Sequence, residues 1–110
     1  TTSGCCNIAL GLQAMAFAAT TGNKNLVIGT EAGKGLSSGN QNTILGAFAG
    51  SNLTTGGDNV FLGTRAGRQV DGGSCNTFIG FEAGRYASNS SNNIGWVDVQ
   101  VVASPLVVSI

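Results

Sequence analysis

Few residues in this chain could carry out chemistry. Histidine, the commonest general base and metal ligand, is absent. The carboxylates show neither D-x-D spacing nor a calcium-loop pattern; they are Glu31, Asp58, Asp71, Glu82 and Asp98. No Cys-x-x-Cys pair suggests a zinc site. We therefore expect no catalytic residue, no cofactor-binding residue and no metal ligand, and we predict that the chain is not an enzyme.

Composition narrows the class of protein. The 110 residues carry 5 Lys+Arg and 5 Asp+Glu, which argues against a nucleic-acid partner and against electrostatic membrane binding. Glycine is frequent at 18, but a single proline and the lack of a G-X-Y period exclude collagen. No apolar run is long enough for a transmembrane helix. This composition favours a structural or adhesive protein.

Thr1 in place of Met is what we expect of a fragment or a processed product.

A repeat of 17 residues organises the chain. It divides residues 7–92 into the units 7–24, 25–41, 42–58, 59–75 and 76–92, of which the first has 18 residues and the others have 17. Counted from the first residue of each unit, the units share Asn at position 1, Ile or Leu at 4, Gly at 5 and Ala at 8. The asparagines, with one more after the last unit, are Asn7, Asn25, Asn42, Asn59, Asn76 and Asn93. The position-5 glycines are Gly11, Gly29, Gly46, Gly63 and Gly80.

The repeat length indicates one rung of a β-solenoid. Helix pairs and leucine-rich repeats need longer units, whereas 17 residues hold two short strands and two turns. Positions 2–4 have the β-branched and aromatic residues of a strand, and we expect position 12 to lie in a second strand. We therefore predict an all-β fold, a β-solenoid of 17-residue rungs over residues 1–92. Its asparagines would form a structural ladder of stacked amides, and its position-5 glycines would turn the chain.

Both ends of the repeat depart from the pattern. Residues 14–19 have helix propensity, so the first unit is either a rung, which we prefer, or a helical cap. Residues 93–110 are apolar and predict a strand near 97–101, a turn at Ser104 and Pro105, and a strand at 106–110. These strands would cap the solenoid, pair between subunits or begin another module.

The predicted strand is apolar on both of its faces. Position 3 points away from positions 2 and 4, so one face lines the core and the other leaves an apolar stripe that a monomer rarely exposes. We expect copies of the chain to pack on this second face. We assign it to position 3, that is, to Val27, Ile44, Phe61 and Phe78.

The cysteines are Cys5, Cys6 and Cys75. Cys6 and Cys75 both directly precede a rung asparagine and would lie four rungs, about 19 Å, apart. A disulfide needs Cα atoms within about 7 Å, so we predict no Cys6–Cys75 bond within one chain. A bond between chains and small buried thiols are the two alternatives.

Charged residues gather at two positions of the rung. They form either a ligand-binding stripe or a solvated edge, on which Arg65 and Glu82 of adjacent rungs could pair. Position 7 holds Glu31, Arg65 and Glu82, and position 10 holds Lys34, Arg68 and Arg85.

The pattern N-T-x-[I/L]-G-x-x-A-G over residues 7–92 resembles the glycine-rich repeats of phage tail fibres and tail spikes, which often precede an endosialidase-type intramolecular chaperone. More loosely, it resembles the head repeats of trimeric autotransporter adhesins. The resemblance implies a homotrimeric fibre segment on a virion or an extracellular surface. It would serve extension and host-surface attachment, with a glycan or a protein as receptor, without cofactor, nucleic acid or membrane insertion. The alternatives are a cell-surface trimeric adhesin, a self-assembling extracellular filament and, less favoured, a glycan-cleaving tail spike.

Overall fold

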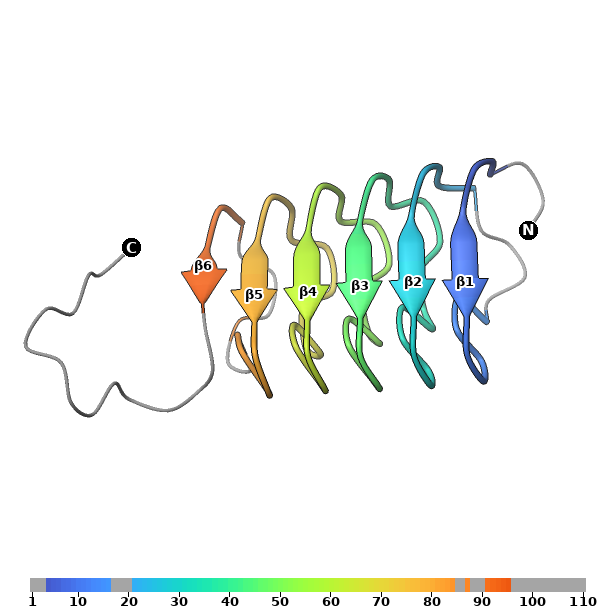
Figure 1. The fold of residues 1–110 in the computed structure, drawn as a ribbon. Helices are drawn as coiled ribbons and strands as arrows, with labels where there is room; N and C mark the ends of the chain where they lie inside the picture. The colour runs from blue at the N-terminus through green and yellow to red at the C-terminus, as the bar shows by residue number, and fades with distance from the viewer. Residues whose placement is uncertain (1–3, 17–20, 85–86, 88–90, 96–110) are drawn as a thin grey trace, which may run out of the picture.

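The computed structural model describes residues 4–16, 21–84, 87 and 91–95. Its strands form a single parallel sheet in chain order (Figure 1). Each strand pairs with the next in the same register, so that equivalent positions of successive units lie side by side. The predicted all-β solenoid with rungs of 17 residues is thereby confirmed. The strands are β1 (Ile8–Leu10), β2 (Leu26–Ile28), β3 (Thr43–Leu45), β4 (Val60–Leu62), β5 (Thr77–Ile79) and β6 (Ile94–Gly95).

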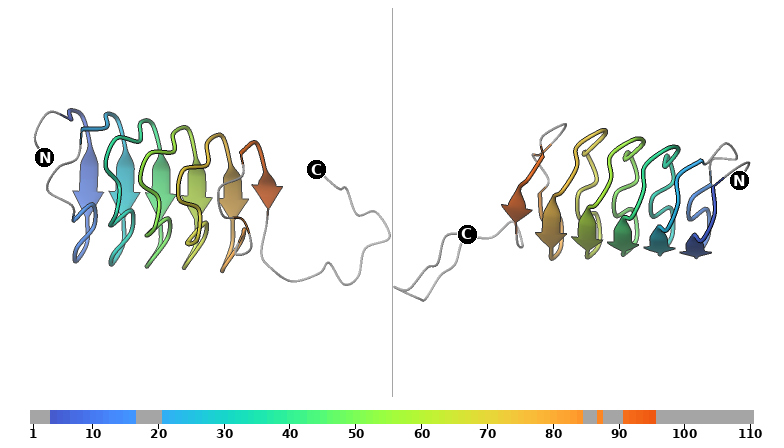
Figure 2. Two further views of the ribbon diagram at one scale, coloured as in Figure 1. Left: turned by 180° about the vertical axis from the view of Figure 1, so that it is seen from behind. Right: turned by 90° about the horizontal axis from the view of Figure 1, so that it is seen from above.

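Each described rung has one strand, which forms one wall of the solenoid, and turns make up the other sides (Figure 2). The second strand expected at position 12 is wrong: Leu36 and Leu53 are fully buried there but lie outside any strand. The reason is the backbone, since positions 7, 9 and 17 all take positive φ, as at Glu31, Gly33 and Gln41. A left-handed residue every few positions bends the chain too often for an extended segment to form.

Hydrogen bonds join the rungs around their whole perimeter. In the turns, the backbone N–H of Ser37 donates to the carbonyl oxygen of Thr54 one rung further on, at 3.0 Å. At another corner the N–H of Gln41 donates back to the carbonyl oxygen of Asn23 at 2.9 Å. Because these bonds continue outside the sheet, the turns stack as regularly as the strands do.

Two glycine columns allow the rungs to approach closely. The position-5 glycines have φ between 120° and 134°; at Gly63 a Cβ atom would lie 2.6 Å from the carbonyl oxygen of Gly80. A second column at position 15 was not foreseen, because it lies in the polar tail of the repeat. At Gly39 of this column a Cβ atom would collide with the carbonyl oxygen of Gly56. Side chains are therefore excluded wherever one backbone rests directly on the next.

The assignment of the two strand faces must be reversed. Val27, Ile44, Phe61 and Phe78 are 0–2% exposed within a single chain, so position 3 lines the core and cannot form an interface between chains. The position-9 glycines make room for these side chains, since a Cβ atom on Gly67 would lie 2.7 Å from the Phe61 ring. The two phenylalanine rings stack with their centroids 5.5 Å apart. The core is completed by the alanines of position 8 and by Leu36, Leu53 and Val70 at position 12.

The ends of the repeat are described in part. Residues 14–16 follow the same turn as the later rungs and are not helical, with Met15 buried in the place of the position-9 glycine; residues 17–20 lie outside the described residues. At the other end, β6 adds a sixth strand beyond the predicted boundary at residue 92. The strands and the turn predicted within 96–110 lie outside the described residues.

Candidate functional site

The outer face of the sheet is a stripe of half-exposed apolar side chains from positions 2 and 4. Leu62 and Ile79 are partly buried against their neighbours, whereas Ile8 and Leu10 at the first rung are 54% and 58% exposed. The outer face consists of Ile8, Leu10, Leu26, Ile28, Thr43, Leu45, Val60, Leu62, Thr77, Ile79 and Ile94.

The outer face carries no charged residue, and its polar members are threonines. Six strands spaced about 4.8 Å apart make it about 24 Å long. Its strands lie nearly parallel side by side (Figure 1), and each has the same length and register as its neighbour, apart from the shorter β6. An uncharged, apolar strip of this kind is typical of a surface on which protein packs.

The asparagines form a buried hydrogen-bonded ladder inside the wall. The Nδ2 group of Asn42 donates to Oδ1 of Asn25 and to the carbonyl oxygen of Gly56, both at 3.0 Å. Its Oδ1 accepts from the backbone N–H and the Nδ2 of Asn59, at 3.1 and 3.0 Å. Among the described residues no buried side-chain nitrogen or oxygen lacks a partner. The ladder thus holds each strand to the next rung and to the position-15 glycine of its own rung.

The charged positions pair with one another. Arg65 donates from Nη1 to Glu82 Oε2 on the next rung at 2.9 Å, as the spacing predicted, and its guanidinium lies 5.9 Å from the centre of the Phe81 ring. Within one rung Lys34 lies 3.5 Å from Glu31. These contacts favour a solvated edge over a ligand-binding stripe. Arg85 lies outside the described residues.

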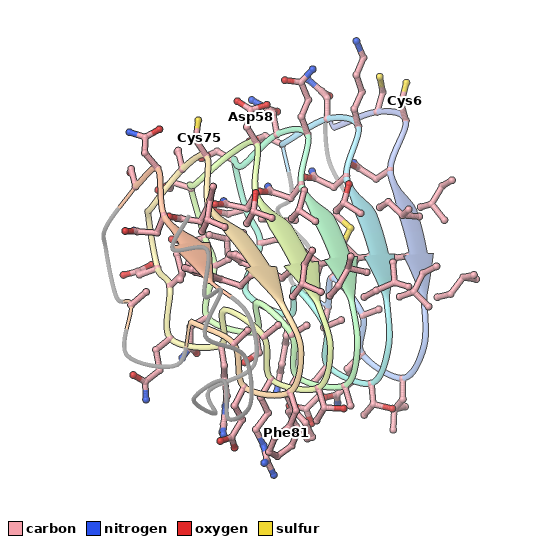
Figure 3. All side chains as sticks on the ribbon, turned by 60° about the vertical axis from the view of Figure 1, so that its left-hand side comes forward. Cys6, Asp58, Cys75 and Phe81 are labelled. Carbon is pink, nitrogen blue, oxygen red and sulfur yellow. The ribbon has the colours of Figure 1, made fainter. Side chains whose placement is uncertain are left out.

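The carboxylates are spread over the described rungs. Glu31 and Glu82 share a column but lie three rungs, about 14 Å, apart. Asp71 accepts a hydrogen bond from the Thr54 hydroxyl at 2.7 Å, and Asp58 projects from the corner at position 17 (Figure 3). Over the described ranges no three Cys, Asp or Glu side chains gather as metal ligands would. None of these segments forms a helix with the length and hydropathy that a membrane crossing needs.

A shallow polar hollow of about 220 Å³ lies beside the same corner. It is lined by Asn23, Lys24, Asn40 and Gln41 from two neighbouring rungs. The amide oxygen of Asn40 is already engaged, since it accepts the backbone N–H of Asn23 at 2.7 Å. Sequence reasoning did not single out this hollow, because it depends on two adjacent polar tails that vary between the units.

All three cysteines are free thiols on the surface, so the alternative of small buried thiols is wrong. Cys6 and Cys75 project from one edge of the solenoid at the two ends of a column, and Phe81 lies at the opposite edge (Figure 3). Because they are separated by four rungs, no bond joins them within one chain. Cys5 lies beside Cys6, with its Sγ atom 2.7 Å from that of Cys6.

Comparison of the chain with protein-family models, with curated proteins and with solved structures found no match. The geometry of the described residues therefore carries the functional argument.

Proposed function

We propose that the chain is a structural segment of a homotrimeric surface fibre, as in a phage tail fibre or a related appendage, and that it serves extension and host-surface attachment. The observation that carries the proposal is the outer face, an uncharged apolar strip along a solenoid whose own core is already complete. Because the core does not need these side chains, their apolar character requires another explanation, and packing of further copies supplies one.

The rod suits a mechanical role. Each rung adds about 4.8 Å of length and is held to the next by backbone hydrogen bonds on all its sides, by the asparagine ladder and by the buried columns. A pull along the axis is therefore shared among many bonds at every rung. The two glutamates that share a column do not suggest hydrolysis within one chain, since a glycosidase pair lies within about 10 Å and Glu31 and Glu82 are three rungs apart.

The dimensions of the outer face predict that these rungs alone assemble weakly. A strip about 24 Å long and about 10 Å wide covers about 240 Å², well below the roughly 800 Å² per partner of a standard stable interface. Around a threefold axis each chain would contact two neighbours, and the interface would continue wherever more rungs follow. We therefore expect assembly that depends on protein concentration over these rungs alone.

Charge substitutions on the two faces of β4 test the proposal. For Leu62→Asp we expect a loss of about 1 kcal/mol of apolar burial and about 2 kcal/mol of carboxylate desolvation per subunit. The oligomer should dissociate, while circular dichroism still reports folded β-structure. The control is Gln69→Asp in the same rung, which is exposed away from the sheet and should assemble as the wild type does. Phe61→Asp places a charge in the core and should unfold the chain instead.

Light scattering measures the mass of each variant. A trimeric wild type, a trimeric Gln69→Asp chain and a monomeric, folded Leu62→Asp chain are the expected results. A wild type that stays monomeric up to about 1 mM, where even weak association is populated, would contradict the proposal, as would a Leu62→Asp chain that remains trimeric.

A further inference from the structure

Two adjacent thiols, those of Cys5 and Cys6, meet at the first corner of the solenoid. Both side chains are exposed, and their Sγ atoms lie 2.7 Å apart. Cys75 occupies the same corner four rungs further on, but the residue before it is Ser74. One end of this column therefore has a pair of thiols and the other end has a single thiol.

The rung geometry fixes the backbone that carries the two sulfur atoms. In an extended strand, successive side chains point to opposite sides. At Cys6 the backbone is left-handed, with φ at 65°, as it is at every described residue that directly precedes a rung asparagine. The next rung fixes the neighbouring peptide groups, since Asn23 Oδ1 accepts the N–H of Cys5 at 2.8 Å and the N–H of Lys24 donates to the carbonyl oxygen of Cys5 at 3.0 Å. The next rung thus fixes the backbone of the corner, on which the two thiols lie side by side.

We propose that Cys5 and Cys6 are a redox modification site that forms a reversible disulfide between adjacent residues, with a small disulfide such as oxidised glutathione as the oxidant. One thiol loses its proton, and its thiolate attacks a sulfur of the oxidant, which releases one reduced thiol and leaves a mixed disulfide. The neighbouring thiol then loses its proton and attacks the protein sulfur of the mixed disulfide. This forms the bond between Cys5 and Cys6 and releases the second half of the oxidant as a reduced thiol. In total the pair gives up two protons and two electrons, and the oxidant becomes two thiols.

The bond should be easy to reverse. The Cα atoms of adjacent residues are about 3.8 Å apart across a trans peptide, closer than the roughly 4.4–6.8 Å of ordinary disulfides. Strained or exposed disulfides are the readily reduced ones. The contact with Cys6 also raises the pKa of the Cys5 thiol. The raised pKa lowers the share of reactive thiolate at neutral pH, so alkaline pH should speed the oxidation. The inference does not depend on the proposed fibre function, because it concerns a corner at the edge of the solenoid.

Intact-protein mass spectrometry tests the inference. The Cys75→Ser chain, which keeps only the pair, is treated with oxidised glutathione and then with reduced glutathione. We expect the loss of two hydrogen atoms without an adduct, the loss of both titratable thiols, and full recovery on reduction. The Cys5→Ser and Cys6→Ser chains, each combined with Cys75→Ser, should instead carry one glutathione.

A designed pair at the far end of the column provides a matched test. Ser74→Cys, in a chain with Cys5→Ser and Cys6→Ser, places two adjacent thiols at an equivalent corner, where φ at Cys75 is 60°. This pair should also lose two hydrogen atoms. Stable double glutathione adducts, or covalent dimers in place of the internal bond in the Cys75→Ser chain, would overturn the proposal. A disulfide that forms between Cys5 and Cys6, together with only glutathione adducts at residues 74 and 75, would show that the shared corner geometry does not favour the bond.

Discussion

The substitution Asn42→Asp removes the two hydrogen-bond donors of one ladder side chain with almost no change in shape. In the native chain the Nδ2 group donates to Oδ1 of Asn25 and to the carbonyl oxygen of Gly56. A carboxylate at this position offers only acceptors, so it would face two oxygen atoms without a proton between them. The site is 1% exposed, so water cannot replace the lost donors.

The expected cost is about 4 kcal/mol. Leaving an uncompensated charge inside a protein destabilises it by about 3–5 kcal/mol, a large part of the roughly 5–15 kcal/mol that stabilises a typical domain. The matched control is Asn40→Asp two residues earlier, where the side chain is exposed. The Oδ1 atom of Asn40 accepts a hydrogen bond from the N–H of Asn23, and a carboxylate oxygen can accept the same bond. We expect this control to change the free energy of unfolding by less than about 0.5 kcal/mol.

The penalty should depend on pH with a definite sign. Burial disfavours the charged form, so the pKa of the introduced carboxyl rises on folding above its unfolded value of about 3.9. At pH values below about 4 both states bind the proton and the penalty is smallest. As the pH rises from there, the unfolded chain releases the proton first, so the free energy of unfolding falls by up to about 1.4 kcal/mol per pH unit. The full cost of about 4 kcal/mol is therefore reached over about 3 pH units.

Urea unfolding at a series of pH values measures this difference. The gap in unfolding free energy between Asn42→Asp and Asn40→Asp should widen from about pH 4 to about pH 7. Equal stabilities of the two variants at neutral pH, or a gap that does not change with pH, would refute the account of the ladder as a buried and fully paired network.

Two further substitutions test the packing of the rungs and the charged edge. Gly63→Ala should lower the melting temperature by several degrees, because its φ is 129° and the new Cβ atom would lie 2.6 Å from the carbonyl oxygen of Gly80. Gly35→Ala should lower it less, since φ there is not positive and the nearest atom, the carbonyl oxygen of Ser51, is 3.3 Å away, a tight contact that a shift of a few tenths of an ångström relieves; equal thermal melts would count against the close approach. A double-mutant cycle on Arg65 and Glu82 should give a coupling of about 0–1 kcal/mol that shrinks with added salt, whereas a larger coupling independent of salt would contradict a solvated edge.

The period and the register could be predicted from the sequence. Asparagine and glycine recur at fixed positions of every unit, and stacking in register is the arrangement that places each glycine on the next. The observed pairing of Thr43 with Val60, and of Ile44 with Phe61, follows directly from the 17-residue spacing. The pairing of Arg65 with Glu82 on the next rung follows from the same register.

The inward face could not be predicted from alternation alone, because both faces of the strand are apolar. The signal that would have decided it lies elsewhere in the rung. Positions 1 and 3 point to the same side, so the asparagine ladder and the position-3 side chains had to share an interior. The glycine at position 9 leaves room for the larger side chains at position 3, as Gly67 does for the ring of Phe61. Thr43 and Thr77 at position 2 also indicated that positions 2 and 4 form the outer face, because polar residues favour the exposed side of a strand.

The remaining misses depend on backbone conformation. The second strand at position 12 was inferred from apolar residues, but side-chain character does not reveal the left-handed residues on either side, such as Phe48 with φ at 63°. The position-15 glycines lie in a polar, glycine-rich turn, where glycine is common, so their recurrence did not indicate close packing between rungs. Only the stacked rungs show that the carbonyl oxygen of Gly56 accepts from Asn42 and that its Cα lies against the next rung.

Immunogold electron microscopy of the intact native particle tests the central claim most directly. Antibodies raised against residues 21–84 would be applied to particles before and after disruption. The proposal predicts gold on thin fibres that project from the surface of intact particles, at a constant distance from the point of attachment. Gold that appears only after disruption, or that marks no projecting structure, would contradict the proposal that the chain is a surface fibre segment.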